Sequence, residues 1–248
     1  MIVFIGMETS GAFRRRFQAL GHHVVSCDLL PAEDGAGYDP STGGHVVGDV
    51  FQTLDDLWAA GRWPDLAIFH PTCTYLTGSG EWAYKDPDFV RYPGVGYHQK
   101  PKPETLVGVE RRQAREEALN GVRRIIALPI ARKVIENPVG VIGTRIRKPT
   151  QTVQPNQFGD DASKRTCLWY FGNDGAALRD MIVPLDPTLQ VPPRMVDGRP
   201  RWANQSPCGA FKAGPSADRW KDRSRTYAGI ADACTAHWAS LPPQPTLL

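Results

Sequence analysis

Short apolar segments alternate with helical stretches along most of the first 140 residues. The segment at 2–6 is rich in β-branched residues and is typical of a buried strand, and Phe13, Phe17 and Leu20 follow it at helical spacing. Further strands are predicted at 23–28, 45–50, 65–70 and 133–138, and further helices at 53–60 and 104–128. Strands that alternate with helices in this way form mostly parallel, doubly wound sheets, so the sequence predicts an α/β fold.

A polar or reactive side chain lies at or just after the end of each predicted strand. In chain order these residues are Ser10, Asp28, Asp49, Cys73 and Glu136. Doubly wound sheets bind their ligands outside the carboxyl ends of the strands. A single acid at a strand end is usually a helix cap or a turn residue, but its repetition from strand to strand favours one shared site.

The fourth predicted strand leads into FHPTCTYLTGSG at 69–80, which places Cys73 on a Gly-rich loop. A thiolate is a strong nucleophile, and cations or helix N-termini near such a loop lower the pKa of a thiol. A cysteine is more often a small buried apolar residue. The polar residues on both sides of Cys73 nevertheless favour the reactive interpretation.

Glu136 lies in an apolar strand just before Asn137 and Pro138. Burial raises the pKa of a carboxyl group, so the sequence predicts an acid that donates a proton near neutral pH, with a simple turn residue as the alternative. A thiolate beside a proton donor suits conjugate addition to an electron-poor ring such as a pyrimidine. The thiolate would add at C6, the acid would support N3, and C5 would attack an electrophile.

The turn after the first strand suits an adenosine cofactor. Backbone N–H groups are available at the turn and at the start of the following helix, and Asp28 at the end of the next strand could bind ribose hydroxyls. We therefore expect a cofactor and a pyrimidine to meet at this edge of the sheet.

The composition excludes several classes of protein. Five cysteines occur without a Cys-x-x-Cys pair, which argues against a zinc cluster and against a disulfide scaffold. The formal net charge is only +3, so the chain is no polycationic nucleic-acid tail. No apolar run reaches membrane-spanning length and the first residues do not resemble a signal peptide, so we expect a soluble protein of a reducing compartment, with neither a metal nor a membrane partner.

The pattern changes after residue 140. Strands are predicted at 150–155 and 166–171, and the stretch that follows is irregular and rich in proline. We divide the chain into a catalytic and cofactor-binding α/β domain at 1–171, a short irregular region at 172–223 and a C-terminal helix at 224–240 that returns to the α/β domain.

Six motifs follow one another along the chain: SGAFRRRFQALGHHVVSCD, GDV, HPTCTYL, ENP, QFGDDASKRTCLW and RSRTYAGIADA. In this order they resemble the C5-cytosine DNA methyltransferase family, and in particular its short, phage-type members. The resemblance extends from residue 1 to about residue 239. It implies a Rossmann-like methyltransferase fold, S-adenosylmethionine as the cofactor, DNA as the partner and, for a phage-encoded chain, the bacterial cytoplasm. We expect a monomer.

The resemblance also assigns roles to single residues. Cys73 matches the nucleophile, Glu136 the acid that contacts N3 of cytosine, and Arg165 an arginine that helps to position the acid and the base. The residues matched to the S-adenosylmethionine pocket are Glu8, Ser10 and Gly11 at the methionine end, Asp28 at the ribose, Asp49 at the adenine amino group, Pro71 and Thr226. The residues expected to contact DNA are Thr77, Ser79, Lys164, Arg201 and Trp202.

The family keeps its target-recognition region between the arginine motif and the last motif, which corresponds to 172–223 here. Trp202, Trp220 and the basic residues around them could stack on bases and contact phosphates. Alternatively, the tryptophans cover the edge of the core. So short a region predicts a short or degenerate target site, or a substrate that needs no base flipping.

Three departures from the family pattern leave the reaction open. Thr72 rather than proline precedes Cys73, the first motif reads METSGAF, and the arginine motif SKRT has a single arginine. We keep three hypotheses: transfer of a methyl or related one-carbon group to C5 of cytosine in DNA through a Cys73 adduct, the same chemistry on a free pyrimidine nucleotide or single-stranded DNA, and a catalytically inactive relative that binds DNA or the cofactor.

Overall fold

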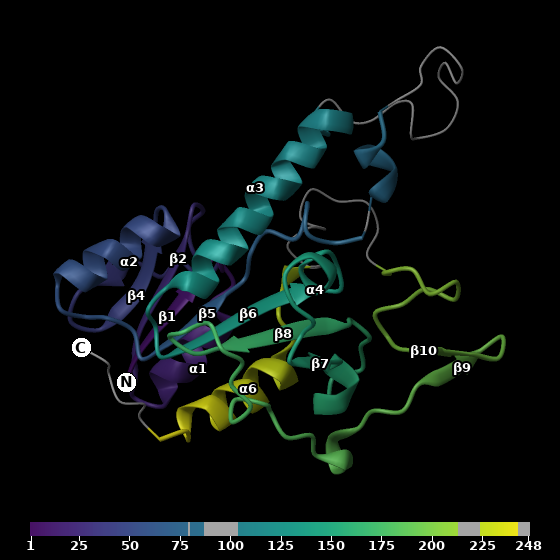
Figure 1. Cartoon of the computed structure of the whole chain (residues 1–248). Helices are drawn as coiled ribbons and strands as arrows, with labels where there is room; N and C mark the ends of the chain where they lie inside the picture. Colours follow the sequence, from purple (N-terminus) through teal and green to yellow (C-terminus); the bar gives the residue numbers. More distant parts are fainter. Residues whose placement is uncertain (79, 87–103, 213–223, 243–248) are drawn as a thin grey trace.

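The computed structural model describes residues 1–78, 80–86, 104–212 and 224–242. Its main sheet contains β1 (Ile2–Gly6), β2 (His23–Asp28), β3 (Tyr38–Asp39), β4 (Gly43–Val47), β5 (Leu66–Phe69), β6 (Arg132–Pro138), β7 (Gln151–Val153) and β8 (Thr166–Phe171). The strand order is β3-β4-β2-β1-β5-β6-β8-β7 (Figure 1).

The five strands β4, β2, β1, β5 and β6 are parallel neighbours, whereas β3, β8 and β7 add antiparallel pairs at the two edges. Numbered along the chain, the parallel strands have the order 3-2-1-4-5, which is the doubly wound arrangement. The order reverses between β1 and β5, so the loops after these two strands diverge and leave a crevice at the carboxyl edge. The predicted Rossmann-like, mostly parallel α/β fold is confirmed.

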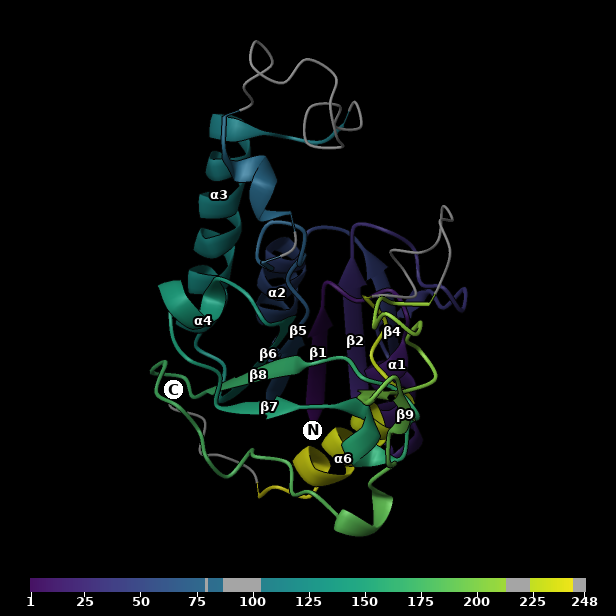
Figure 2. The ribbon, with the colours of Figure 1, turned by 90° about the vertical axis from the view of Figure 1, so that its right-hand side faces the viewer.

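Helices cover both faces of the sheet (Figures 1 and 2). Their bounds are Ala12–Ala19 for α1, Val50–Ala59 for α2, Gly108–Ala127 for α3, Ile142–Arg145 for α4 and Ala228–Ala239 for α6. Three short 3-10 helices lie at Glu81–Tyr84 (η1), Pro155–Phe158 (η2) and Pro187–Leu189 (η3).

The core has two halves, one on each face of the sheet. Val3 and Ile5 of β1 pack with α1 and α6, whereas Phe4 points to the other face and packs with α2 and α3. Successive side chains of a strand point to opposite faces, so a central strand covered on both sides is apolar throughout. This explains why the segments at 2–6 and 65–70 read as continuous apolar runs in the sequence.

Two predicted boundaries are wrong. The third predicted strand, 45–50, ends at Val47, because Asp49 is already the N-cap of α2 and accepts hydrogen bonds from Phe51 N (2.9 Å) and Gln52 N (3.0 Å). The last helix begins at Ala228 rather than at residue 224.

The region predicted to be irregular contains a small hairpin. β9 (Arg194–Val196) and β10 (Arg199–Arg201) pair antiparallel outside the main sheet (Figure 1). Asp197 and Gly198 connect them, both with positive φ, which is the geometry of a tight two-residue turn. Residues 213–223 of this region lie outside the described ranges.

A buried lysine makes the free energy of unfolding change with pH in the alkaline range. Lys133 of β6 is fully buried, its Nζ donates to the Leu128 carbonyl, and burial lowers its pKa to about 8. The unfolded chain binds this proton up to about pH 10.5, so the free energy of unfolding rises with pH between these two values. In urea unfolding at about pH 7 and pH 10, we expect the wild type to gain on the order of 1 kcal/mol relative to Lys133→Met. An identical pH response of the two proteins would contradict this assignment.

Candidate active site

A cavity of about 290 Å³ opens at the carboxyl edge of the sheet, beside the reversal between β1 and β5. Its wall is built from the turn after β1, the end of β2, the loop after β5, the end of β6 and the segments around residues 164 and 226. The predicted site residues that line it are Glu8, Ser10, Asp28, Pro71, Cys73, Glu136, Lys164 and Thr226. The fold therefore brings together residues more than 200 positions apart in the sequence.

Cys73 lies on a tight turn directly after β5. Its carbonyl accepts hydrogen bonds from the backbone N–H groups of Leu76 (3.1 Å) and Thr77 (3.0 Å). The residue is partly exposed and belongs to the cavity wall. Pro71 ends the pairing of β5 before this turn, since proline has no backbone N–H to donate to the sheet. The local sequence thus removes Cys73 from the core and places it at the cavity.

The chain after Glu136 holds this turn in place. Asn137 Nδ2 donates to the Pro71 carbonyl at 2.6 Å, and Val141 N–H donates to the Leu76 carbonyl at 2.7 Å. A Cβ atom at Gly140 would lie 1.9 Å from the Leu76 carbonyl oxygen, so this approach requires glycine. Glu136 thus contributes an acid to the cavity, and the residues after it fix the loop that carries Cys73.

Glu136 is nearly buried and pairs with His70 through Oε2 and Nδ1, 3.1 Å apart. Burial acts to raise the pKa of Glu136, but the His70 hydrogen bond and the positive charge of Lys164 outweigh it and lower the pKa. The raised pKa predicted from the sequence is therefore wrong. The error arose because neither basic neighbour is close to Glu136 in the sequence.

Lys164, rather than Arg165, faces Glu136. Lys164 lines the cavity, and its Nζ donates to the Ser224 and Arg225 carbonyls at 3.1 and 3.0 Å. Arg165 is exposed and lies outside the cavity wall. Because side chains alternate in the extended chain entering β8, only one of these two neighbours can point inward. The structure thus places a lysine where the resemblance placed an arginine.

The turn after β1 forms the opposite wall. Glu8 is buried, and its Oε1 accepts hydrogen bonds from Ser10 Oγ and from Ala12 N (2.9 Å) at the start of α1. Within the described ranges, no hydrogen-bond partner reaches the buried Oε2 of Glu8. An unsatisfied carboxylate oxygen in a cavity wall is costly unless a ligand occupies the cavity.

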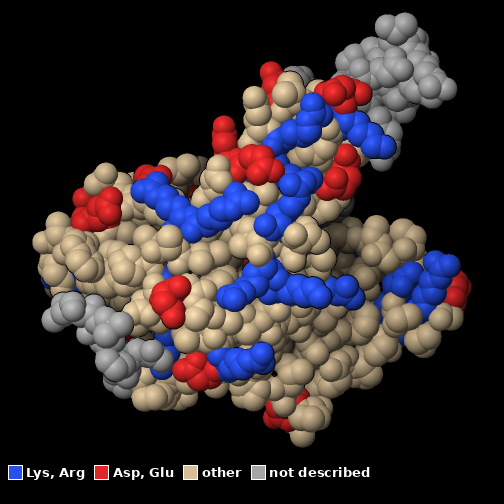
Figure 3. All heavy atoms as spheres, viewed as in Figure 1, with Lys and Arg blue, Asp and Glu red and all other residues tan. Residues whose placement is uncertain are grey.

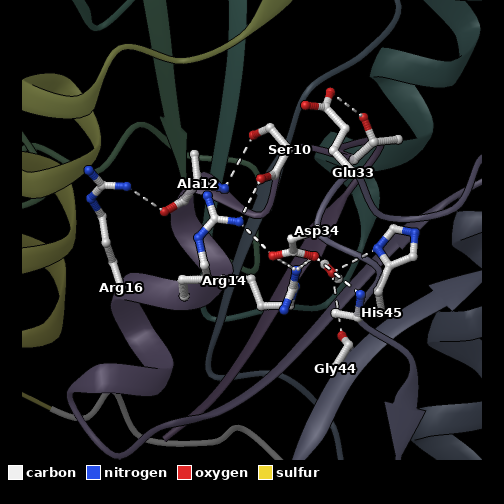
Figure 4. A network of polar contacts seen from close by, with 12 residues as sticks. Ser10, Ala12, Arg14, Arg16, Glu33, Asp34, Gly44 and His45 are labelled. Carbon is white, nitrogen blue, oxygen red and sulfur yellow. Dashed lines mark hydrogen bonds and ion pairs between the residues drawn. The ribbon is translucent and has the colours of Figure 1, made fainter.

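The loop after β2 is tied to α1 by ion pairs. Asp34 lies against Arg14 (2.7 Å) and Arg15 (2.5 Å), as Figure 4 shows for Arg14. Although partial burial opposes the shift, hydrogen bonds from both arginines lower the pKa of Asp34 to about 2. The loop that supplies Glu33 to the cavity wall is therefore anchored at neutral pH.

A second cavity of about 600 Å³ adjoins the first. Both are lined by Ser10, Glu33, Arg225 and Thr226. The second extends between the N-terminal ends of α1 and α6, where Arg15, Arg16 and Tyr227 complete its wall. The two cavities together are large enough for a nucleoside-sized ligand at the first and its extension into the second.

Several predicted residues lie away from both cavities. Asp49 caps α2, Gly11 precedes α1 with φ 65°, and Thr77 is buried in a bridge to Gly140. Arg201 donates to the Pro200 and Pro207 carbonyls (both 2.8 Å), and Trp202 Nε1 donates to the Val191 carbonyl (3.3 Å). These bonds hold the segment around the hairpin together. Ser79 lies outside the described residues.

Sequence reasoning missed His70 and the structural role of Asn137. Both are sequence neighbours of predicted site residues, since His70 immediately precedes Pro71 and Asn137 follows Glu136. The signal that could have identified His70 is its position at the end of an apolar strand, where an ionisable ring replaces the usual apolar residue.

Neither a protein-family model nor a curated protein matches the sequence. Among solved structures, a mutant form of DNMT2 from Spodoptera frugiperda matches with a TM-score of 0.36 and 14% sequence identity. The match covers 70% of this chain and 50% of the other, so this chain spans about half of that protein. Such a likeness identifies neither a family nor an activity, so the function is inferred from the residues of the cavity.

No described helix combines the length and apolar character needed to cross a bilayer. In the described ranges, no group of three or more His, Cys, Asp or Glu side chains is arranged to hold a metal ion.

Proposed function

We propose that the protein transfers a methyl group from S-adenosylmethionine to C5 of cytosine in DNA. One observation carries the proposal: Cys73 and Glu136 line the same cavity as five of the seven residues matched to the cofactor pocket. Those five are Glu8, Ser10, Asp28, Pro71 and Thr226. They come from four distant parts of the chain.

The residues of the cavity support a nucleophilic mechanism. The Cys73 thiolate would attack C6 of cytosine, and the ring electrons would move toward N3 and C5. N3 would take up a proton from water, and the Glu136 carboxylate would accept a hydrogen bond from the resulting N3–H and stabilise this adduct. S-adenosylmethionine would supply the electrophilic methyl group for C5. Loss of the C5 proton to water and expulsion of the Cys73 thiolate would then restore the ring, and the N3 proton would return to water.

The cavity fits a cofactor that carries positive charge. Glu8 Oε2 is a buried carboxylate oxygen for which the described residues offer no donor, and Asp28 and Glu33 line the same wall. A sulfonium or ammonium group would compensate such a carboxylate, and ribose hydroxyls would donate to a second one. Glu8 and Ser10 would hold the methionine end of S-adenosylmethionine, and Asp28 its ribose.

Glu8→Gln tests the charge match directly. Glutamine keeps an oxygen that accepts from Ala12 N, so the cap of α1 remains while the negative charge is lost. We expect the Kd for S-adenosylmethionine to rise about 10- to 100-fold in calorimetric titrations, as for the loss of a charge-assisted contact. Glu117→Gln, an exposed position on α3, serves as the control. Equal affinities of the wild type and Glu8→Gln would exclude this contact.

Exposed basic side chains on α3 and around the end of α4, outside the cavity wall, would suit DNA as the substrate. Figure 3 shows Lys and Arg side chains gathered over α3 and along the surface below it. The exposed basic residues of α3 and of the segment around the end of α4 are Arg112, Arg123, Arg124, Arg145, Arg147 and Lys148. The DNA backbone is a polyanion and binds such surfaces by releasing counterions. The exposed face of any solvated helix could carry the same charges. DNA and nucleotide substrates must therefore be compared directly.

The test of the proposed function compares substrates. The protein is incubated with S-adenosylmethionine and duplex DNA, single-stranded DNA or dCMP, and the digested products are analysed for 5-methylcytosine by mass spectrometry. We expect 5-methylcytosine in DNA and slower or no conversion of dCMP. If dCMP is converted, and if this conversion is inhibited by other mononucleotides but not by DNA, the nucleotide hypothesis is favoured. Binding of cofactor and DNA with no product would favour the inactive relative.

A further inference from the structure

A histidine that received no role from the sequence contacts the proposed catalytic acid. His70 follows β5 directly and lines the cavity, and its Nδ1 lies 3.1 Å from Glu136 Oε2. The two side chains are only 11% and 10% exposed. We propose that His70 is the positioning residue of Glu136, which it holds with one carboxyl oxygen toward β5 and the other available to cytosine N3. This inference rests on the proposed function.

The surroundings of His70 define its hydrogen-bonding state. A carboxylate accepts hydrogen bonds, so Nδ1 must carry the hydrogen. Nε2 is buried, and the described part of the chain offers it no partner. The charged ring and the neutral ring with its hydrogen on Nδ1 both present an N–H to Glu136 at this nitrogen. His70 thus acts as a fixed N–H donor.

Packing fixes the direction of this donor. The His70 ring lies against Phe13 of α1, with ring centroids 5.7 Å apart, and Phe13 in turn stacks on Trp238 of α6 at 5.8 Å. The imidazole therefore rests on two helices of the α1/α6 face, while its Nδ1 points to β6. A donor supported in this way restricts the carboxyl rotamers of Glu136.

Other ionisable groups around Glu136 lack this direct contact. Lys164, before β8, acts on Glu136 through its charge. The thiols of Cys167 in β8 and Cys234 in α6 also interact electrostatically with Glu136, and burial raises the pKa of both. Among the described residues, His70 is the side chain that forms a hydrogen bond with the Glu136 carboxylate.

Two substitutions separate the N–H donor from the rest of the ring. His70→Phe keeps an aromatic ring against Phe13 and removes the donor, whereas Asn at this position places an amide N–H near the place of Nδ1. We expect His70→Phe to lower kcat for methyl transfer about 100-fold, as for a misplaced catalytic group, with the Kd for S-adenosylmethionine unchanged. His70→Asn should recover activity to within about fivefold of the wild type.

The matched control is His45 of β4. It is more deeply buried than His70 and makes two hydrogen bonds of 2.9 Å, to Ser26 and to the Leu30 carbonyl, but it lies outside the cavity wall. His45→Phe should perturb stability without the selective loss of kcat. Wild-type activity in His70→Phe would overturn the inference. So would a His70→Asn protein as inactive as His70→Phe, because the ring itself would then be required.

A second readout is independent of catalysis. The carboxyl carbon of Glu136, followed by ¹³C NMR, should titrate at higher pH in His70→Phe than in the wild type, because the lost hydrogen bond favoured the charged form. His70→Asn should titrate close to the wild type. Identical titrations in all three proteins would also overturn the inference. If the wild type transfers no methyl group while this titration depends on His70, the proposed function fails and the contact stands.

Discussion

Cys73→Ser is expected to lower kcat for methyl transfer to DNA by at least about 1,000-fold, with the Kd for S-adenosylmethionine within about twofold of the wild type. Serine keeps the size of the side chain, and the turn depends on the backbone carbonyl of residue 73, so the loop should fold as before. The hydroxyl is a far weaker nucleophile than a thiolate at neutral pH, and addition at C6 should fail. Single-turnover methylation and calorimetry measure the two quantities.

The control for Cys73→Ser is Cys208→Ser. Cys208 is exposed and lines neither cavity, so its replacement should leave kcat unchanged. Methyl transfer by Cys73→Ser at more than about one tenth of the wild-type rate would contradict covalent catalysis through this residue. The inactive-relative hypothesis predicts instead that the wild type and both variants bind alike and transfer nothing.

Glu136→Gln is expected to lower kcat about 100- to 1,000-fold, the range typical for the loss of one group that stabilises charge in the transition state. The amide fills the same volume and can still accept the His70 hydrogen bond, but it carries no negative charge to stabilise the protonated N3. Binding of S-adenosylmethionine should change little, because Glu8, Ser10 and Asp28 form the opposite wall. The measurement is single-turnover methylation at saturating cofactor and DNA.

Glu117→Gln is the matched control for Glu136→Gln, because it makes the same change on an exposed turn of α3. Its kcat should equal that of the wild type. A Glu136→Gln protein with full activity would show that N3 protonation does not require this carboxyl group. The proposed mechanism, in which Cys73 and Glu136 act on the same base, would then be contradicted.

Local patterns in the sequence predicted the central sheet well. Apolar runs such as 2–6 are buried on both faces, and this burial makes them continuous. The boundary near Asp49 failed because one polar residue can end a strand or cap a helix, and only the hydrogen bonds from Phe51 and Gln52 decide. The edge strand β3 has two residues and leaves no readable period.

The site was predicted in part. Cys73, Glu136 and most of the residues predicted to bind a cofactor meet in one cavity, since strand ends in a doubly wound sheet share one edge. Side-chain direction and electrostatics could not be predicted in the same way. The choice between Lys164 and Arg165 depends on which one points inward, and the pKa of Glu136 depends on His70, 66 positions away.

The irregular region at 172–223 was the least predictable part. Its described residues hold themselves together through contacts such as those of Arg201 and Trp202 with nearby carbonyls. Asn204 joins the region to the site, because it exchanges hydrogen bonds with the Ser163 backbone and donates to Tyr227. Isolated Trp and Arg residues in a proline-rich stretch carry no period from which such contacts could be predicted. The role of the region in DNA binding remains a prediction.

The formation of a covalent bond between Cys73 and C6 of cytosine is the central claim, and trapping tests it most directly. Wild type and Cys73→Ser are incubated with S-adenosylmethionine and an oligonucleotide that contains 5-fluorocytosine, and intact mass is measured after denaturation. Fluorine at C5 cannot leave as a proton does, so the reaction should stop at the methylated adduct. We predict an adduct with the combined mass of protein, oligonucleotide and methyl group in the wild type and none in Cys73→Ser. An adduct in both proteins, or none in a wild type that binds the cofactor, would contradict the claim.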